Sequence, residues 1–239
     1  MLAIARSEVI QIFRNRLVLV TGLVIPFVLG GYFVYQHERF ADLGSVGFIA
    51  AIVLFTVMAF GLYTTAVTTL ASRRQNLFLK RLRSTAAGDA EILTGLVLPV
   101  ALIALLQAVS IMVVLALVTT GPAQIPVLAA GVLATTAMMV ALALATAGLT
   151  TSPEQAQVTT LPVSLYLVAV ASWVGITGTD DLARLKRLLP GGSLTELVVD
   201  AWNGGVPLVD SLPLLATTMG WVLVAVALAS RLFRWEPRR

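Results

Sequence analysis

Six long apolar stretches constrain the fold of this chain more than any other feature. They occupy residues 18–35, 44–71, 92–119, 125–151, 158–177 and 212–233. A helix needs roughly 20 apolar residues to cross the hydrocarbon core of a bilayer. Only helices and closed barrels satisfy every backbone group in lipid, and these stretches are continuous rather than alternating, so they predict helices. We therefore expect an all-α polytopic membrane protein with six transmembrane helices, forming one domain over residues 1–239.

The composition argues against most soluble functions. Hydrophobic residues make up 58% of the chain and charged residues only 12%, whereas soluble domains carry about 25% charged residues. There is no cysteine and only one histidine, His37, so a thiolate or histidine metal cluster and a Ser-His triad are not expected. The sequence also lacks a GxxxxGK[ST] phosphate-binding loop. We therefore expect no catalytic residue, no cofactor site and no metal site in this chain.

The basic residues are unevenly divided between alternate loops. With the N-terminus in the cytoplasm, twelve of the 16 Lys and Arg residues lie inside, and only Arg39, Arg184, Lys186 and Arg187 lie outside. Such a bias sets orientation by the positive-inside rule, so the net charge of +4 indicates topology rather than nucleic-acid binding. We expect a multi-pass protein with both termini cytoplasmic.

Two flanking segments predict further short helices. Residues 2–16 form an amphipathic pattern that favours an interfacial helix, with a cytosolic extension of the first span as the alternative. Residues 178–211 are too charged to span, and they predict two short helices that rest on the outer interface or dip into it, as a lid or a connector. The pattern Ser193-x-x-Glu196 predicts a capping box at the start of the second of these helices.

A stripe of hydroxyl groups ends the second apolar stretch. Thr64 and Thr68, and likewise Thr65 and Thr69, are one helical turn apart. Two interpretations of these hydroxyl groups fit the sequence. The hydroxyls line a path for a polar or amphiphilic molecule, or they bond to their own helix and to its neighbours.

The loop at residues 73–84 is the most informative connection. Phe78, Leu79 and Leu82 share one face of a short helix, while Lys80, Arg81 and Arg83 project elsewhere. This pattern predicts a basic amphipathic helix on the cytoplasmic surface, which either anchors to anionic lipid or docks a cytosolic partner. The spans carry essentially no ionisable residue in their middle, which argues against a proton- or ion-coupled transporter. Energy for uphill transport would have to come from a partner.

At this loop the sequence resembles the type-2 ABC transporter permease family. Residues Lys80-Arg81-Leu82-Arg83-Ser84-Thr85 resemble the second half of a family motif, Arg-Glu-x-Gly-Thr-Leu-x-x-Leu-Arg-x-Thr-Pro, which follows span two. The Glu-Gly-Thr part is replaced by Asn76, Leu77 and Phe78, and Ala86 stands at the final proline. The turn Glu154-Gln155-Ala156 and the end Phe233-Arg234-Trp235-Glu236-Pro237-Arg238 also resemble the family.

The resemblance implies the membrane subunit of a bacterial ABC exporter in the plasma (inner) membrane. It implies a second permease subunit, in a homodimer or heterodimer, and a cytosolic ABC ATPase that carries the ATP and Mg, so this chain is not an enzyme by itself. The short helix at 73–85 would be the coupling helix, contacting the ATPase through Leu79, Lys80, Arg81, Leu82, Arg83 and Thr85. Spans two and five would line the substrate path through Phe55, Tyr63, Thr64, Tyr166 and Trp173.

A small amphiphile such as a drug, an antibiotic or a lipid is the favoured substrate, because the outer loops are short and aromatic residues are only 7%. Drug efflux and antibiotic resistance are the corresponding expectations. The alternatives are a membrane anchoring or signalling protein that binds only lipid, and a passive pore without an ATPase.

Overall fold

The computed structural model describes residues 2–85, 87–204, 206–233 and 235, and every regular element in these ranges is a helix. Five helices are long and apolar enough to cross a membrane, and a sixth candidate is a bent pair. This confirms the all-α polytopic fold. Ala86, Arg234 and residues 236–239, on which part of the family resemblance and of the inner positive charge rests, lie outside the described residues.

The first span is the bent one. It consists of α2 (Arg16–Leu19), the π-helical segment η1 (Val20–Val24) and α3 (Ile25–Tyr35). At Gln36 the chain turns by 76° into α4 (His37–Leu43). The amphipathic helix expected at 2–16 is present as α1 (Leu2–Arg14).

Four of the other five spans extend beyond their apolar stretches into polar sequence at one end, whereas α9 lies within its stretch. The second span is one continuous helix made of α5 (Val46–Thr56), the π-helical η2 (Val57–Thr64) and α6 (Thr65–Gln75). The remaining spans are α8 (Asp89–Val118), α9 (Ile125–Leu149), α10 (Pro153–Thr177) and α13 (Leu208–Leu232). Hydroxyl caps fix two of the starts, since Ser45 accepts from the Phe48 N–H at 3.1 Å and Ser152 accepts from the Gln155 N–H at 3.2 Å.

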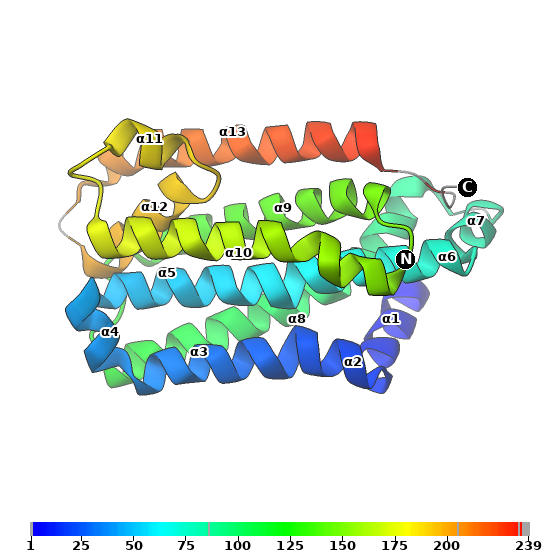
Figure 1. Cartoon of the computed structure of the whole chain (residues 1–239), viewed down its shortest axis with the longest axis horizontal. Coiled ribbons are helices and arrows are strands. Elements are labelled where there is room, and N and C mark those ends of the chain that lie inside the picture. The colour runs from blue at the N-terminus through cyan, green and yellow to red at the C-terminus, as the bar shows by residue number, and fades with distance from the viewer. Residues whose placement is uncertain (1, 86, 205, 234, 236–239) are drawn as a thin grey trace.

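The second span is the centre of the bundle. Helices α8, α9, α10 and α12 all pack against it, and its apolar window is 89% buried within the chain. Figure 1 shows α5 running between its neighbours, with α13 lying on α9 and α3 on the opposite side. The second span therefore forms the core of the bundle, because neighbouring helices rather than lipid cover most of its surface.

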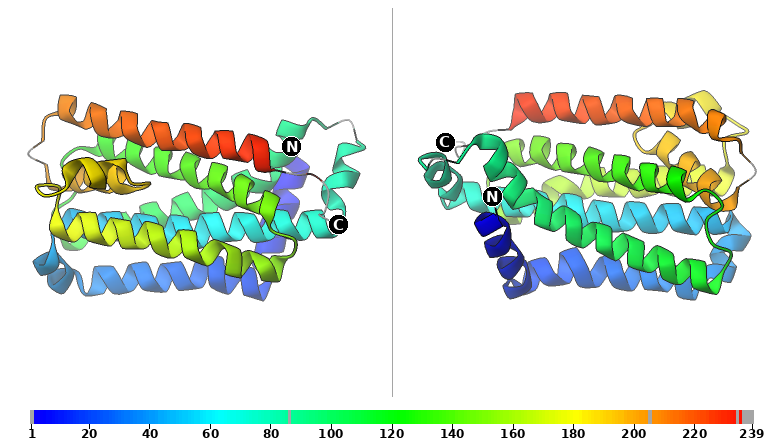
Figure 2. Two further views of the ribbon diagram at one scale, coloured as in Figure 1. Left: turned by 45° about the horizontal axis from the view of Figure 1, so that its top comes forward. Right: turned by 180° about the vertical axis from the view of Figure 1, so that it is seen from behind.

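The ends of the bundle differ in content. Helices α1 and α7 (Phe78–Arg83) lie at one end, and α4, α11 (Ala183–Leu188) and α12 (Gly192–Asn203) lie at the other, as both views of Figure 2 show. The fold thus gathers at one end the described basic residues that the sequence places on the cytoplasmic side.

The second outer helix, α12, does not rest on the surface. Residues 191–198 are all buried, and α12 packs against α5, α9, α10 and α13. Gly47 makes this approach possible, because a Cβ there would lie 2.7 Å from the Val199 carbonyl oxygen. The helix therefore dips into the bundle, which is one of the two arrangements that the sequence predicts.

The predicted capping box at the start of α12 is wrong. The helix begins after Gly191, whose φ of +90° suits a glycine, so Ser193 already lies inside the first turn. The Ser193 hydroxyl donates to the Arg187 carbonyl at 2.7 Å, and Glu196 binds the Arg187 guanidinium instead of a backbone N–H. Tertiary partners thus replace the local cap.

The two π-helical segments face each other across the first and second spans. They meet at Gly22 and Gly61, where a Cβ on Gly61 would lie 3.1 Å from the Gly22 carbonyl oxygen. From α8, the Gln107 amide donates to the Leu23 carbonyl at 2.8 Å. A π-helical turn changes the hydrogen-bond ladder of its helix, and such turns occur often at functional sites.

Candidate coupling surface and groove

The short helix α7 projects from one end of the bundle and has the predicted two-faced character. It follows α6 after Leu77, whose φ of +56° turns the chain sharply. Leu79 is only 1% exposed, and Phe78 and Leu82 pack partly buried against the core. Lys80, Arg81 and Arg83 are exposed. The apolar face therefore holds the helix on the bundle, and the basic face is presented outward.

Internal contacts hold the far end of α7. The Arg83 guanidinium donates to Asp89 at 2.9 Å and lies 4.8 Å over the Trp235 ring. The Thr85 hydroxyl donates to the Leu82 carbonyl at 2.6 Å. Among the predicted coupling residues, Leu79, Arg83 and Thr85 thus have contacts within the chain, while Arg81 faces outward with one bond to the Asn76 carbonyl at 3.1 Å.

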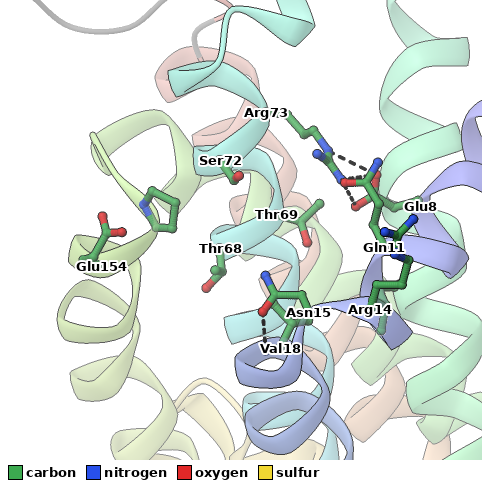
Figure 3. A pocket seen from close by; sticks show the side chains of 12 residues that line it. Glu8, Gln11, Arg14, Asn15, Val18, Thr68, Thr69, Ser72, Arg73 and Glu154 are labelled. Carbon is green, nitrogen blue, oxygen red and sulfur yellow. Dashed lines mark hydrogen bonds and ion pairs between the residues drawn. The ribbon is translucent and has the colours of Figure 1, made fainter.

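An ion pair joins α1 to the stem of α7. The Arg73 guanidinium, near the end of α6, makes three bonds to the Glu8 carboxylate at 3.0–3.2 Å and a further bond to Gln11 (Figure 3). Arg73 also lies 5.5 Å over the Phe78 ring of α7. Glu8 is 2% exposed. The sequence predicts a coupling helix over residues 73–85. In the structure Arg73 belongs to α6 instead, and the separate short helix α7 covers only residues 78–83.

Two adjacent cavities lie between this ion pair and the interior of the bundle. The first, about 560 Å³, is lined by side chains of α1, α6 and the start of α10, and Figure 3 shows most of them. The second, about 250 Å³, continues between the first span, the second span and α10. Val18 and Thr68 line both. We call the two together the inner groove.

The threonine stripe faces this groove and also bonds to its own helix. Thr64 donates to the Ala59 carbonyl at 3.0 Å, a bond that spans the π-helical turn, and Thr68 donates to the Thr64 carbonyl at 2.8 Å. Thr64, Thr65 and Thr68 line the 250 Å³ cavity, and Thr68 and Thr69 line the larger one. The bonds of Thr64 and Thr68 to their own helix are thus present, and the stripe also lines a cavity, while a substrate path along it stays a prediction.

The structure does not bring the five predicted path residues into one lining. Phe55 and Tyr63 are fully buried inside the chain, and the Tyr63 hydroxyl is 2.9 Å from that of Thr146 on α9. Thr64 lines the inner groove. Tyr166 lines a separate apolar cavity of about 220 Å³, and Trp173 lies under the Lys186 ammonium group, 5.4 Å away.

A polar cluster ties the outer helices together. Buried Lys186 donates to the Thr177 hydroxyl at 2.8 Å and to the Gly178 carbonyl at 2.7 Å. The Glu196 carboxylate accepts hydrogen bonds from Arg187 and from Thr179. The bond between Arg187 and Glu196 raises the pKa of Arg187. Burial and the nearby Glu196 charge raise the pKa of Asp200 to about 6, against a smaller lowering by Arg187.

The sequence predicts α7, but it does not indicate that Glu8, Gln11 and Glu154 line a groove, although Glu154 belongs to the turn that resembles the family. Glu8 and Arg73 are 65 residues apart, and no local pattern signals such a pairing. In the sequence, Glu8 and Gln11 are simply polar residues of the amphipathic segment 2–16. Such residues are equally typical of a helix face that contacts only solvent.

These features define a class: a polytopic helical membrane protein with a basic amphipathic helix after its second span and a short helix that dips into the bundle before its last span. The chain belongs to the ABC-2 family of transporter proteins, whose model matches residues 17–231. No curated protein matches it significantly. Membership makes the chain a permease, the membrane subunit of an ABC transporter, and it implies association with an ABC ATPase and with membrane lipid.

Proposed function

We propose that the chain is the permease of an ATP-driven exporter, which moves a small amphiphile out of the cytoplasm. The observation that carries this proposal is the exposed basic face of α7, held on the bundle by Leu79 and by the Arg73–Glu8 ion pair. A partner that moves α7 would also move α6, since the two are joined by only two residues, Asn76 and Leu77. The second span would then carry the movement into the core.

In this proposal a cytosolic ABC ATPase binds ATP and Mg and docks on α7, and a second permease subunit completes the transporter. The protein lies in the bacterial plasma membrane with the α7 end in the cytoplasm. Lys80 and Arg81 make the first contacts with the ATPase, because both are exposed, whereas Leu79 positions the helix. Tyr166 and Thr64 line cavities and are the better supported of the path residues.

Affinity purification from the native membrane in mild detergent, followed by mass spectrometry, tests the partnership. We expect a stoichiometric protein with nucleotide-binding motifs. The Arg81→Glu variant should lose this protein. Arg231→Glu should keep it; this control reverses an exposed charge in the last turn of α13, which ends on the α7 side of the bundle in Figure 1. Recovery of the chain alone, under conditions that preserve another ABC complex, would instead favour an anchoring role or a passive pore.

Reconstituted vesicles test the coupling. The Leu82→Asp variant should keep its fold but lose ATP-dependent transport, because Leu82 is only partly buried at the edge of α7. Transport equal to that of the natural chain would contradict the role of α7. Leak of solute without ATP would identify a pore.

A further inference from the structure

The inner groove changes chemically along its length. Its outer chamber, the 560 Å³ cavity, is lined by charged, amide and hydroxyl side chains from α1, α6 and α10, together with the apolar residues Ile12, Val18 and Pro153. Its inner chamber, the 250 Å³ cavity, is lined by threonines, one glutamine and the apolar residues Val18, Ile25, Phe60 and Leu161. A cavity with a polar mouth and an apolar end matches a molecule with a polar head and an apolar chain.

The inner chamber is less polar than its threonines suggest. The hydroxyls of Thr64, Thr68 and Thr160 each donate to a carbonyl of their own helix, at 3.0, 2.8 and 2.8 Å. Their hydrogens are therefore satisfied before any ligand binds, and the methyl groups remain for contact. Among the described lining residues of this chamber none is charged. An alkyl chain can enter it without leaving a charge buried.

The outer chamber carries charges of both signs. Glu8 and Arg73 neutralise each other through their ion pair. Arg14 and Glu154 are both exposed, and Figure 3 shows them on opposite sides of the chamber. A head group with one positive and one negative charge would place each beside its opposite. A singly charged head group would meet one attractive and one repulsive side chain.

The groove opens toward the bilayer as well as toward the end of the bundle. Ile25 of α3 and Leu161 of α10 line the inner chamber and are 43% and 47% exposed. The outer chamber is lined by residues of α1 and of the last turns of α6, and Figure 2 shows these segments at the same end of the bundle as α7. An amphiphile in the leaflet on that side could therefore enter sideways, with its head group at interfacial depth.

We propose that the inner groove binds a zwitterionic amphiphile, whose head group lies between Arg14 and Glu154 and which places an alkyl chain in the threonine-lined chamber. Export of this ligand rests on the proposed function, whereas its binding to the isolated permease does not. A zwitterionic amphiphile is a narrower substrate class than the small amphiphile of the proposed function.

Thiol protection tests this directly, because the natural chain has no cysteine. The Gln157→Cys variant places one thiol in the inner chamber, and Val158→Cys places one on the next residue, which is 69% exposed and outside the groove. Each variant is reconstituted without ATPase in phosphatidylglycerol nanodiscs. The probes are lysophosphatidylcholine, lysophosphatidylglycerol and hexadecyltrimethylammonium, and the readout is the rate of maleimide labelling.

We expect lysophosphatidylcholine to slow the labelling of Gln157→Cys but not of Val158→Cys, and to do so at lower concentration than the two singly charged probes. In the Gln157→Cys background, a second substitution, Glu154→Gln or Arg14→Gln, should raise the concentration of lysophosphatidylcholine needed for protection. Each should raise it about threefold, as is typical of losing an exposed ion pair. Both changes lie on exposed residues, so the fold should persist, and an unchanged elution profile checks that it does.

Three results would overturn the proposal. Equal protection by all three probes would remove the charge selectivity. Equal protection of both thiols would show an effect of the bilayer alone. A Gln157→Cys thiol that never reacts, together with cross-linking to another chain, would show that a second copy covers the groove. None of these results depends on whether an ATPase copurifies, so this proposal and the exporter proposal can fail separately.

Discussion

At the scale of single residues, Asp200 makes the outer helices sensitive to pH. Its folded pKa of about 6 exceeds its ordinary value of 3.8, because burial and Glu196 disfavour the charged form. The folded state therefore binds a proton more tightly than the unfolded chain does. The resulting stabilisation is fully present below about pH 4 and is lost as the pH rises through about 6.

The Asp200→Asn variant should remove this dependence. It remains neutral at every pH, so it should match the natural chain near pH 4 and be more stable at pH 7.5. The gain should be on the order of 1 kcal/mol, because partial exposure reduces the effect. Thermal unfolding in detergent between pH 4 and 8 measures it, with the exposed Asp210→Asn as the control. A variant less stable at pH 7.5 would contradict the assignment.

Gly148 tests the packing of the last span. A Cβ at this position of α9 would overlap the Leu232 carbonyl at the end of α13, and backbone atoms cannot move aside as a flexible side chain can. Gly148→Ala should therefore lower the free energy of unfolding by about 1–3 kcal/mol. Gly220→Ala on α13, where nothing lies within 4 Å, should be neutral or slightly stabilising. Equal melting temperatures for the two variants would refute the close contact.

At the scale of elements, the Glu8–Arg73 pair determines how α1 sits on the bundle. Glu8→Gln should leave the Arg73 guanidinium largely buried without its carboxylate, at a cost of about 2–3 kcal/mol. The double variant Glu8→Gln/Arg73→Gln should cost less than the sum of the two single changes, because no uncompensated charge remains. Arg6→Gln, an exposed change on α1, serves as the control.

Limited proteolysis provides the readout for this prediction. Glu8→Gln should be cut faster within α1 than the natural chain, whereas Arg6→Gln should not be. With a protease that cuts after arginine, however, Arg6→Gln also removes a cleavage site. A chymotrypsin-type protease, which cuts at aromatic residues such as Phe13, avoids that ambiguity. If the loss of stability in the double variant equals the sum of the losses in Glu8→Gln and Arg73→Gln, the two side chains do not stabilise each other.

Helix positions were predictable and helix depths were not. Continuous apolar runs predicted all six spans to within about five residues at each end, because a lipid environment leaves the backbone almost no alternative to a helix. Hydropathy could not place α12 inside the bundle, since its burial depends on Gly47 allowing close approach to Val199. It also could not show the 76° turn at Gln36.

The candidate site was predictable only where it is local. The pattern of Phe78, Leu79 and Leu82 against Lys80 and Arg81 lies within one turn and a half of helix, so the sequence shows both faces of α7. The inner groove unites side chains of α1, α6 and α10, and only the packing of the spans brings them together. Phe55 and Tyr63 likewise look like lining residues by type, but neighbouring helices bury them completely.

At the scale of the whole molecule, the fold converts a charge bias in the sequence into two chemically different ends. The α1 and α7 end carries exposed Arg6, Arg14, Lys80 and Arg81, and the opposite end carries the Lys186 and Arg187 cluster with its acidic partners. At the latter end Glu196 accepts from Arg187, so part of its positive charge is compensated. The positive-inside rule counts Lys and Arg residues, and most of the described ones lie at the α1 and α7 end, so the rule predicts that this end is cytoplasmic.

Cysteine labelling in whole cells tests the resulting orientation. Ser84→Cys, on an exposed residue after α7, should react with a membrane-impermeant maleimide only after the cells are opened. Arg184→Cys, on an exposed residue of α11, should react in intact cells. Gly192 would be a poor choice for the outer position, because a Cβ there would overlap the Lys186 carbonyl. The reverse labelling pattern would place α7 outside the cell, beyond the reach of any cytosolic ATPase, and would exclude the exporter mechanism together with entry from the inner leaflet.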